Sequence, residues 1–124
     1  MLAFGGMENY VVGNIAFVGD AAAQTNALSK GGIRPGMIAG KWAAEAIVDN
    51  KIREYDLKWK KSKFNSPLIL KAYEKLKSMG NRELLEHIEP FKEHRVMAYL
   101  KSLLFYGRYL ELYEAYDISN KYGW

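Results

Sequence analysis

The sequence predicts a mostly α-helical α/β fragment: a strand–loop–helix unit over residues 1–50, followed by a helical region over residues 51–124. Three observations predict this class. The apolar run NIAFVG is typical of a buried strand. The segment 34–50 is rich in alanine and carries Pro35 in the first turn, where a helix tolerates it. Beyond residue 50, apolar residues recur at helical spacing in several segments.

The first expected element is the strand. Residues 10–20 (YVVGNIAFVGD) are expected to form a hairpin edge and then a strand that is covered on both faces, as in a parallel or mixed sheet. Residues 21–32 follow as an irregular polar loop that contains a glycine pair. A single strand and helix cannot bury both faces of a strand, so this unit is expected to need further partners.

The helix expected over residues 34–50 has two kinds of face. Three apolar residues fall on one face, namely Met37, Ala44 and Ile47. Small residues would let the helix approach a neighbour closely, namely Gly36, Ala39, Gly40 and Ala43. A strand, a loop and a closely packed helix in this order form the βα unit of nucleotide-binding sheets.

The second region is expected to be helical throughout. A helix over 66–80 is predicted from an N-cap serine, from Pro67 in the first turn and from a glycine stop. A shorter helix begins at residue 81 and ends before Pro90. A long helical pattern over 93–124 places one set of residues on the same side, namely Val96, Leu100, Leu103, Gly107 and Leu110.

Composition excludes several chemistries. Cysteine is absent, which excludes disulfides, thiolate metal sites and a cysteine nucleophile. No apolar run reaches the roughly 18–20 residues that cross a bilayer, and no signal peptide opens the chain. Residues 1–50 carry three basic and four acidic side chains, and the other 74 residues carry 15 and ten. We expect a cytoplasmic protein whose basic helices are solvated or contact an anionic membrane, and no nucleic-acid partner, because no binding module is recognisable.

Few side chains in the helical region are candidates for chemistry. His87 and His94 are seven residues apart, but Pro90 breaks their register and no acids stand at metal spacing, so we expect surface or interface histidines and no metal site. The basic segment KWKKSK predicts a solvated turn, with an anionic-membrane contact as the alternative. A series of tyrosines at helical spacing indicates packing, with an amphipathic surface as the alternative: Tyr99, Tyr106, Tyr109, Tyr113 and Tyr116.

The stretch VGDAAAQTNALSKGGIRPGMIAG is the best candidate for a binding site. An apolar strand that ends in Asp20 would place a carboxylate at a sheet edge, where it could accept two hydrogen bonds from a polyol or ribose. Gly31 and Gly32 leave backbone N–H groups unobstructed. The helix that follows directs its positive end to the same place. The alternative is purely structural: a tight alanine–glycine contact, with Asp20 as a loop cap.

The same residues resemble the C-terminal FAD-binding motif of the geranylgeranyl reductase family, within the p-hydroxybenzoate-hydroxylase-like flavoproteins. The resemblance covers about a quarter of the chain. The matching positions are Gly19, Asp20, Ala21, Ala22, Asn26, Gly32, Ile33, Met37, Gly40, Ala43 and Ala44. Three positions depart from the pattern: Ala27 replaces a usual proline, and Ala23 and Lys30 each replace a usual glycine.

The resemblance implies a flavin site. Asp20 would bond the ribityl hydroxyls, and the backbone of Gly31–Ile33 would lie beside the N1/C2=O edge of the isoalloxazine. Lys30 would stabilise anionic flavin or point to solvent. The cofactor-binding set is Gly19, Asp20, Ala21, Ala22, Asn26, Lys30, Gly31, Gly32 and Ile33. No catalytic residue is assigned.

The resemblance also implies a function. Family members reduce isoprenoid double bonds of lipid precursors, so the chain is expected to be part of an FAD-dependent oxidoreductase with an apolar substrate. An N-terminal Gly-x-Gly-x-x-Gly unit is missing from the 124 residues, so a further flavoprotein part or a homo-oligomer is expected to complete the site. The alternatives are a monooxygenase or electron-transfer flavoprotein, and a non-catalytic helical module for lipid or protein contact.

Overall fold

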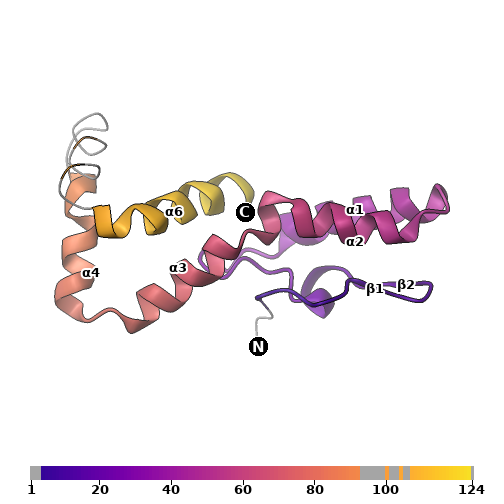
Figure 1. Ribbon diagram of the computed structural model, residues 1–124, viewed down its shortest axis with the longest axis horizontal. Helices are drawn as coiled ribbons and strands as arrows, with labels where there is room; N and C mark the ends of the chain where they lie inside the picture. The colour runs from indigo at the N-terminus through magenta and orange to yellow at the C-terminus, as the bar shows by residue number, and fades with distance from the viewer. Residues whose placement is uncertain (1–3, 93–99, 101–103, 105–106, 124) are drawn as a thin grey trace.

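The computed structural model describes residues 4–92, 100, 104 and 107–123, and most of them are helical (Figure 1). The α-helices are α1 (Ile33–Val48), α2 (Ile52–Lys61), α3 (Pro67–Ser78), α4 (Asn81–Ile88) and α6 (Leu110–Tyr122). Short 3-10 helices are η1 (Gly19–Ala22), η2 (Lys63–Asn65), η3 (Glu89–Lys92) and η4 (Gly107–Tyr109). The strands are β1 (Val11–Val12) and β2 (Ile15–Ala16). The expectation of a mostly helical chain is therefore confirmed.

The strands form a small hairpin and not the strand covered on both faces that the sequence suggested. β1 and β2 pair antiparallel, with Val12 opposite Ile15. Gly13 opens the two-residue turn at φ +60°, a conformation that glycine adopts without strain. The chain folds back at this turn, before the apolar run, and Val12 and Ile15 on its two sides are 58% and 62% exposed. The expectation of a covered strand was therefore wrong.

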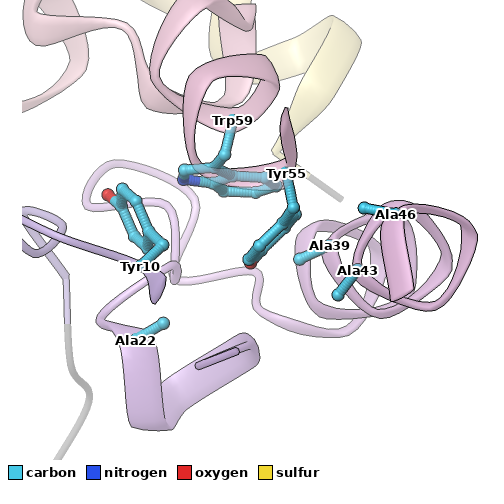
Figure 2. Close-up of a cluster of buried hydrophobic side chains, with 7 residues drawn as sticks. All are labelled: Tyr10, Ala22, Ala39, Ala43, Ala46, Tyr55 and Trp59. Atoms are coloured by element: carbon cyan, nitrogen blue, oxygen red, sulfur yellow. The ribbon is translucent and has the colours of Figure 1, made fainter. Parts of the chain in front are cut away.

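The first core lies between α1 and α2 and is closed by the N-terminal segment. Buried residues from all three parts meet there, namely Tyr10, Ala22, Ala39, Ala43, Ala46, Tyr55 and Trp59. Figure 2 shows the alanines of α1 facing the ring of Tyr55 on α2. Small side chains on α1 thus accommodate large rings on α2. This core combines residues from both sides of residue 50.

The face of α1 that holds Met37, Ala44 and Ile47 is on the opposite side from the core. Met37 is 71% exposed, Ile47 is 52% exposed, and Ala44 is exposed as well. The packing partner of α1 is an aromatic pair on α2, which fits against alanines rather than against longer side chains. Of the small residues, Ala39 and Ala43 are buried, as expected for a close approach.

The second core joins α3 to α6. Its buried residues are Ala72, Tyr109, Leu112 and Ala115, with Leu68 and Leu76 packed against them. The start of α3 at Pro67 and the end of α4 before Pro90 confirm those predictions. Ser66 makes no side-chain capping hydrogen bond. Leu110, which begins α6, is 41% exposed.

Candidate functional site at the start of helix α1

Asp20, Thr25 and Gly32 meet where η1, the following loop and α1 come together. Asp20 is exposed, and its Oδ1 accepts a hydrogen bond of 2.7 Å from the hydroxyl of the buried Thr25. A Cβ added at Gly32 would stand 3.1 Å from Thr25 Oγ1 and 3.3 Å from Asp20 Oδ1. Glycine at position 32 therefore keeps a space open directly beside the carboxylate.

This space belongs to an open pocket of about 600 Å³. Its lining consists of Asp20, Thr25, Lys30, Gly32, Ile33 and Gly36. Because α1 begins at Ile33, the N–H groups of its first turn carry partial positive charge at the same place. A carboxylate that accepts hydroxyl donors and a helix end that attracts negative charge thus share one pocket, as the sequence indicated.

Two glycines bring α1 close to η1. A Cβ added at Gly36 would lie 3.6 Å from the Cα of Gly19, which itself has φ +63°. Gly19 also donates its N–H to Oε1 of Gln24 at 2.7 Å. Gly19 and Gly36 therefore face each other where the Asp20 segment meets the helix, at a distance where an added Cβ would make only ordinary van der Waals contact.

Gln24 is a supporting residue that the sequence analysis did not single out. It is buried, and its Nε2 donates to the Tyr55 hydroxyl at 2.8 Å. That hydroxyl in turn donates to the carbonyl of Phe17 at 2.9 Å. Burial raises the pKa of Tyr55. This chain of hydrogen bonds connects η1 to α2. No spacing of residues in the sequence indicated it.

Asn26 lies inside the loop and not in the pocket. It is 6% exposed, and its Oδ1 accepts hydrogen bonds from Leu28 N at 2.9 Å and from Ser29 N at 3.0 Å. The same oxygen accepts the hydroxyl of Ser119 on α6 at 3.1 Å. Asn26 therefore shapes the loop and fastens it to the C-terminal helix.

Gly31 also takes part in the contact between the loop and α6. A Cβ at this position would overlap the carbonyl of Gly123, to which the Ser29 hydroxyl donates at 2.6 Å. Arg34 in the first turn of α1 donates to the carbonyl of Lys121 at 2.6 Å. The end of α6 thus rests on the loop, and Gly31 is required for that backbone contact.

The two positions that depart from the glycine pattern both have left-handed backbone. Ala23 has φ 51° and Lys30 has φ 59°, a region that costs a residue with a Cβ about 1–2 kcal/mol. The Lys30 ammonium lies 4.4 Å from the ring centroid of Phe4 and 4.0 Å from that of Tyr73. The cation therefore contacts two aromatic faces, an arrangement that the sequence did not suggest.

The remaining members of the expected set divide between core and surface. Ala22 is fully buried in the first core, whereas Ala21 is exposed. Ile33 is 82% exposed at the pocket edge. The structure thus places Asp20, Lys30, Gly32 and Ile33 around one pocket.

His87 is remote from this pocket, and the expectation of a surface or interface histidine was wrong. It is 5% exposed between α4 and α6, where its Nε2 lies 3.0 Å from the Tyr116 hydroxyl. Burial raises the pKa of Tyr116. Tyr109 is also buried, so these described tyrosines pack as expected. His94, Tyr99 and Tyr106 lie outside the described residues.

The first four residues of the basic segment KWKKSK form the last turn of α2, Ser62 follows it and Lys63 begins η2, so the segment is only in part a turn between elements. Trp59 is buried there, and Lys58, Lys60 and Lys61 surround it. Within the described ranges no helix is long and apolar enough to cross a membrane. Over the same ranges no three His, Asp or Glu side chains are grouped so that they could hold a metal ion.

The pocket at the start of α1 thus brings together Asp20, Lys30, Gly32 and Ile33 of the expected set. It offers one carboxylate, one helix N-terminus and glycine-cleared backbone, all open to solvent. Comparison of the chain with protein-family models, with curated proteins and with solved structures gives no match.

Proposed function

We propose that the chain is part of an FAD-dependent oxidoreductase similar to geranylgeranyl reductases, which reduces carbon–carbon double bonds of isoprenoid lipid precursors. The observation that supports it most is the space beside Asp20 and Gly32, which a Cβ at position 32 would fill. Reduced FAD supplies the hydride for such a reaction. Carboxylate, cleared backbone and helix end fit a ligand with a hydroxylated arm and a ring edge that gains negative charge.

In this proposal Asp20, Thr25, Gly32 and Ile33 have separate roles in cofactor binding. The remaining lone pairs of the Asp20 carboxylate accept hydrogen bonds from hydroxyl groups of the ribityl arm, while the hydrogen bond from the Thr25 hydroxyl keeps the carboxylate in place. Gly32 and Ile33 present the first-turn backbone to the ring edge. The left-handed backbone at Ala23 and Lys30 is consistent with the resemblance, because glycine is usual in the family at both positions.

The exposed side of α1 supports the expectation of a further flavoprotein part or a second copy. Ile33, Met37 and Val48 are 82%, 71% and 79% exposed, and they follow one another along the helix. A covering partner would bury this row and would also supply the rest of the cofactor site. An anionic membrane is the other candidate, and pelleting with anionic and with neutral liposomes separates the two.

The experiment is a titration of residues 1–124 with riboflavin, which carries the ribityl arm, and with lumiflavin, which is the ring without it. We expect weak binding of both, followed by amide shifts at Asp20, Gly32 and Ile33. Asp20→Ala should weaken riboflavin binding about tenfold or more, because bonds to a charged acceptor are lost. The affinity for lumiflavin should stay the same.

Asp49→Ala is the matched control, because it removes an exposed aspartate near the other end of α1. It should change neither titration. Equal riboflavin affinity in Asp20→Ala and in the parent chain would contradict the proposed role of Asp20. A tight stoichiometric FAD complex of the isolated chain would contradict the need for a further part.

The substrate class and the type of reaction have to be determined separately, by product analysis with the complete enzyme. Incubation with an isoprenoid alkene and with an aromatic substrate distinguishes a reductase from a monooxygenase by product. Addition of two hydrogens to the alkene supports the reductase, whereas an inserted oxygen atom identifies the alternative.

A further inference from the structure

Tyr55 of α2 lies outside the loop that follows Asp20, and its hydroxyl is connected to that loop through Gln24. We propose that Tyr55 is a positioning residue for the Asp20 carboxylate, and that it thereby sets the preference of the pocket for a ligand with a hydroxylated arm over a bare ring. This role rests on the proposed function, because the arm in question is the ribityl arm of the flavin. Neither Tyr55 nor Gln24 belongs to the cofactor-binding set that the resemblance implies.

Gln24 closes the turn that begins at Gly19. Its backbone N–H donates to the Gly19 carbonyl at 3.1 Å, and its side-chain Oε1 accepts the Gly19 N–H at 2.7 Å. The Ala23 N–H donates to the Asp20 carbonyl at 3.1 Å. Both polar backbone groups of Gly19 are therefore bound by one residue, and Asp20 follows directly. The direction in which the Asp20 side chain leaves the turn depends on Gln24.

The order of donors and acceptors fixes how the Gln24 amide points. A carbonyl can only accept, so the Tyr55 hydroxyl donates its single proton to Phe17 O, at 2.9 Å. The hydroxyl can then only accept from Gln24, and it accepts from Nε2 at 2.8 Å. This leaves Oε1 to face the Gly19 N–H. Tyr55 thus selects one of two amide orientations, since the opposite one would place an NH₂ donor against the Gly19 N–H.

Burial makes this chain of hydrogen bonds depend on the Tyr55 hydroxyl. Tyr55 is 0% exposed and Gln24 is 5% exposed, so water has little access to either partner. Burial also raises the pKa of Tyr55, so the hydroxyl keeps its proton at neutral pH. Without the hydroxyl the Phe17 carbonyl loses this donor, and the Gln24 amide is free to turn over and lose its bond to Gly19.

The carboxylate is connected to the same segment through Thr25, the residue after Gln24. The Thr25 hydroxyl donates to Asp20 Oδ1 at 2.7 Å, and Thr25 is 5% exposed. A shift of Gln24 therefore moves Thr25 and turns the carboxylate away from the arm. The ring edge is placed differently, because in the proposed site it lies against Gly32 and Ile33 at the start of α1. Loss of the Tyr55 hydroxyl should thus weaken binding of the arm and not binding of the ring.

The experiment compares two variants that each lose one tyrosine hydroxyl. Tyr55→Phe keeps the ring that packs in the first core. In this variant of residues 1–124 the affinity for riboflavin should fall about three- to tenfold, while the affinity for lumiflavin should stay the same. Tyr116→Phe is the matched control, because it removes a partly buried hydroxyl that contacts His87 between α4 and α6. It should change neither affinity.

Two further variants separate positioning from a general loss of structure. In the Asp20→Ala background Tyr55→Phe should lower the riboflavin affinity no further, because the hydroxyl acts through that carboxylate. Gln24→Met interrupts the same hydrogen bonds and should reproduce the selective loss of riboflavin affinity. If Tyr55→Phe does not fold, Gln24→Met decides by the same two titrations. A purely structural role of Tyr55 would weaken binding of both flavins, with or without Asp20.

The proposed function and the role of Tyr55 fail in different ways. Absence of riboflavin binding by the parent chain would overturn the proposed function and the role of Tyr55 with it. If the parent chain binds riboflavin and Tyr55→Phe leaves that affinity unchanged, or lowers it equally for riboflavin and lumiflavin, the role of Tyr55 alone is overturned. Additive effects of Tyr55→Phe and Asp20→Ala on riboflavin affinity would overturn it as well.

Discussion

Replacement of Asn26 by alanine tests whether the loop of the candidate site is held from within. The Oδ1 atom of Asn26 accepts three hydrogen bonds, from the amides of Leu28 and Ser29 and from the hydroxyl of Ser119. Alanine leaves all three donors without this acceptor, in a place where the side chain is 6% exposed. The loop and the end of α6 should therefore loosen together.

The size of the effect follows from those bonds. At about 0.5–1.5 kcal/mol for each bond, Asn26→Ala should lower the free energy of unfolding by about 2–4 kcal/mol. For a chain of this length that corresponds to a fall in Tm of roughly 10 °C. Ser119→Ala removes one of the three donors, so the double variant should show a coupling of about 1 kcal/mol with Asn26→Ala.

The assay is urea unfolding followed by circular dichroism, with the same baseline treatment for every variant. Asn120→Ala is the matched control, because Asn120 is exposed on α6 next to Ser119 and should change stability by less than about 0.5 kcal/mol. A loss of less than about 1 kcal/mol in Asn26→Ala would refute the reasoning, as would additive behaviour with Ser119→Ala.

Four further outcomes are expected in the same assay. Ala23→Gly should stabilise the protein by about 0.5–1 kcal/mol, because it relieves a left-handed residue. Gly40→Ala should stabilise it by a similar amount, since a Cβ there meets nothing within 4 Å. Gly31→Ala should destabilise it by about 1–3 kcal/mol, because the Cβ overlaps Gly123. The raised pKa values of Tyr55 and Tyr116 mean that their contribution is complete below about pH 10, the pKa of an unperturbed tyrosine, and is lost as the pH rises further, so stability should fall as the pH is raised above about 10.

For each of these predictions, a specific experimental result would contradict the reasoning. A destabilised Ala23→Gly variant would mean that the alanine makes contacts worth more than its backbone strain. Gly31→Ala and Gly40→Ala form a pair, and an equal effect of the two would contradict the contact between the loop and α6. An unfolding free energy that is unchanged over the alkaline range would contradict the effect of tyrosine burial.

The helices that the sequence predicted best are those with local start and stop signals. Pro67 and Pro90 mark their boundaries through fixed backbone geometry, so the limits of α3 and α4 could be predicted without knowledge of their partners. The buried face of α1 could not be predicted in this way. Which side of that helix is buried depends on the rings of Tyr55 and Trp59, and these belong to another helix.

The candidate site shows the same division between local and distant causes. The closeness of Asp20 and Gly32 follows from a short loop between them, and the sequence predicted their shared pocket. The role of Gly31 could not be predicted in this way, because its contact is Gly123 near the other end of the chain. The ammonium of Lys30 likewise finds its partners on Phe4 and Tyr73. Neither is marked by a spacing in the sequence.

The attachment of α6 to the loop also has a consequence for the order of folding. Asn26 and Ser119 are 93 residues apart, and Ser29 and Gly123 are 94 residues apart. Contacts of such long range form late, because the intervening chain must first give up its freedom. On a ribosome the Ser29 hydroxyl therefore lacks its Gly123 acceptor, and Asn26 Oδ1 lacks the Ser119 donor, until residues 119–123 have emerged. The docking of α6 against the loop is therefore among the last events of folding, and the backbone contact at Gly31 is completed only then.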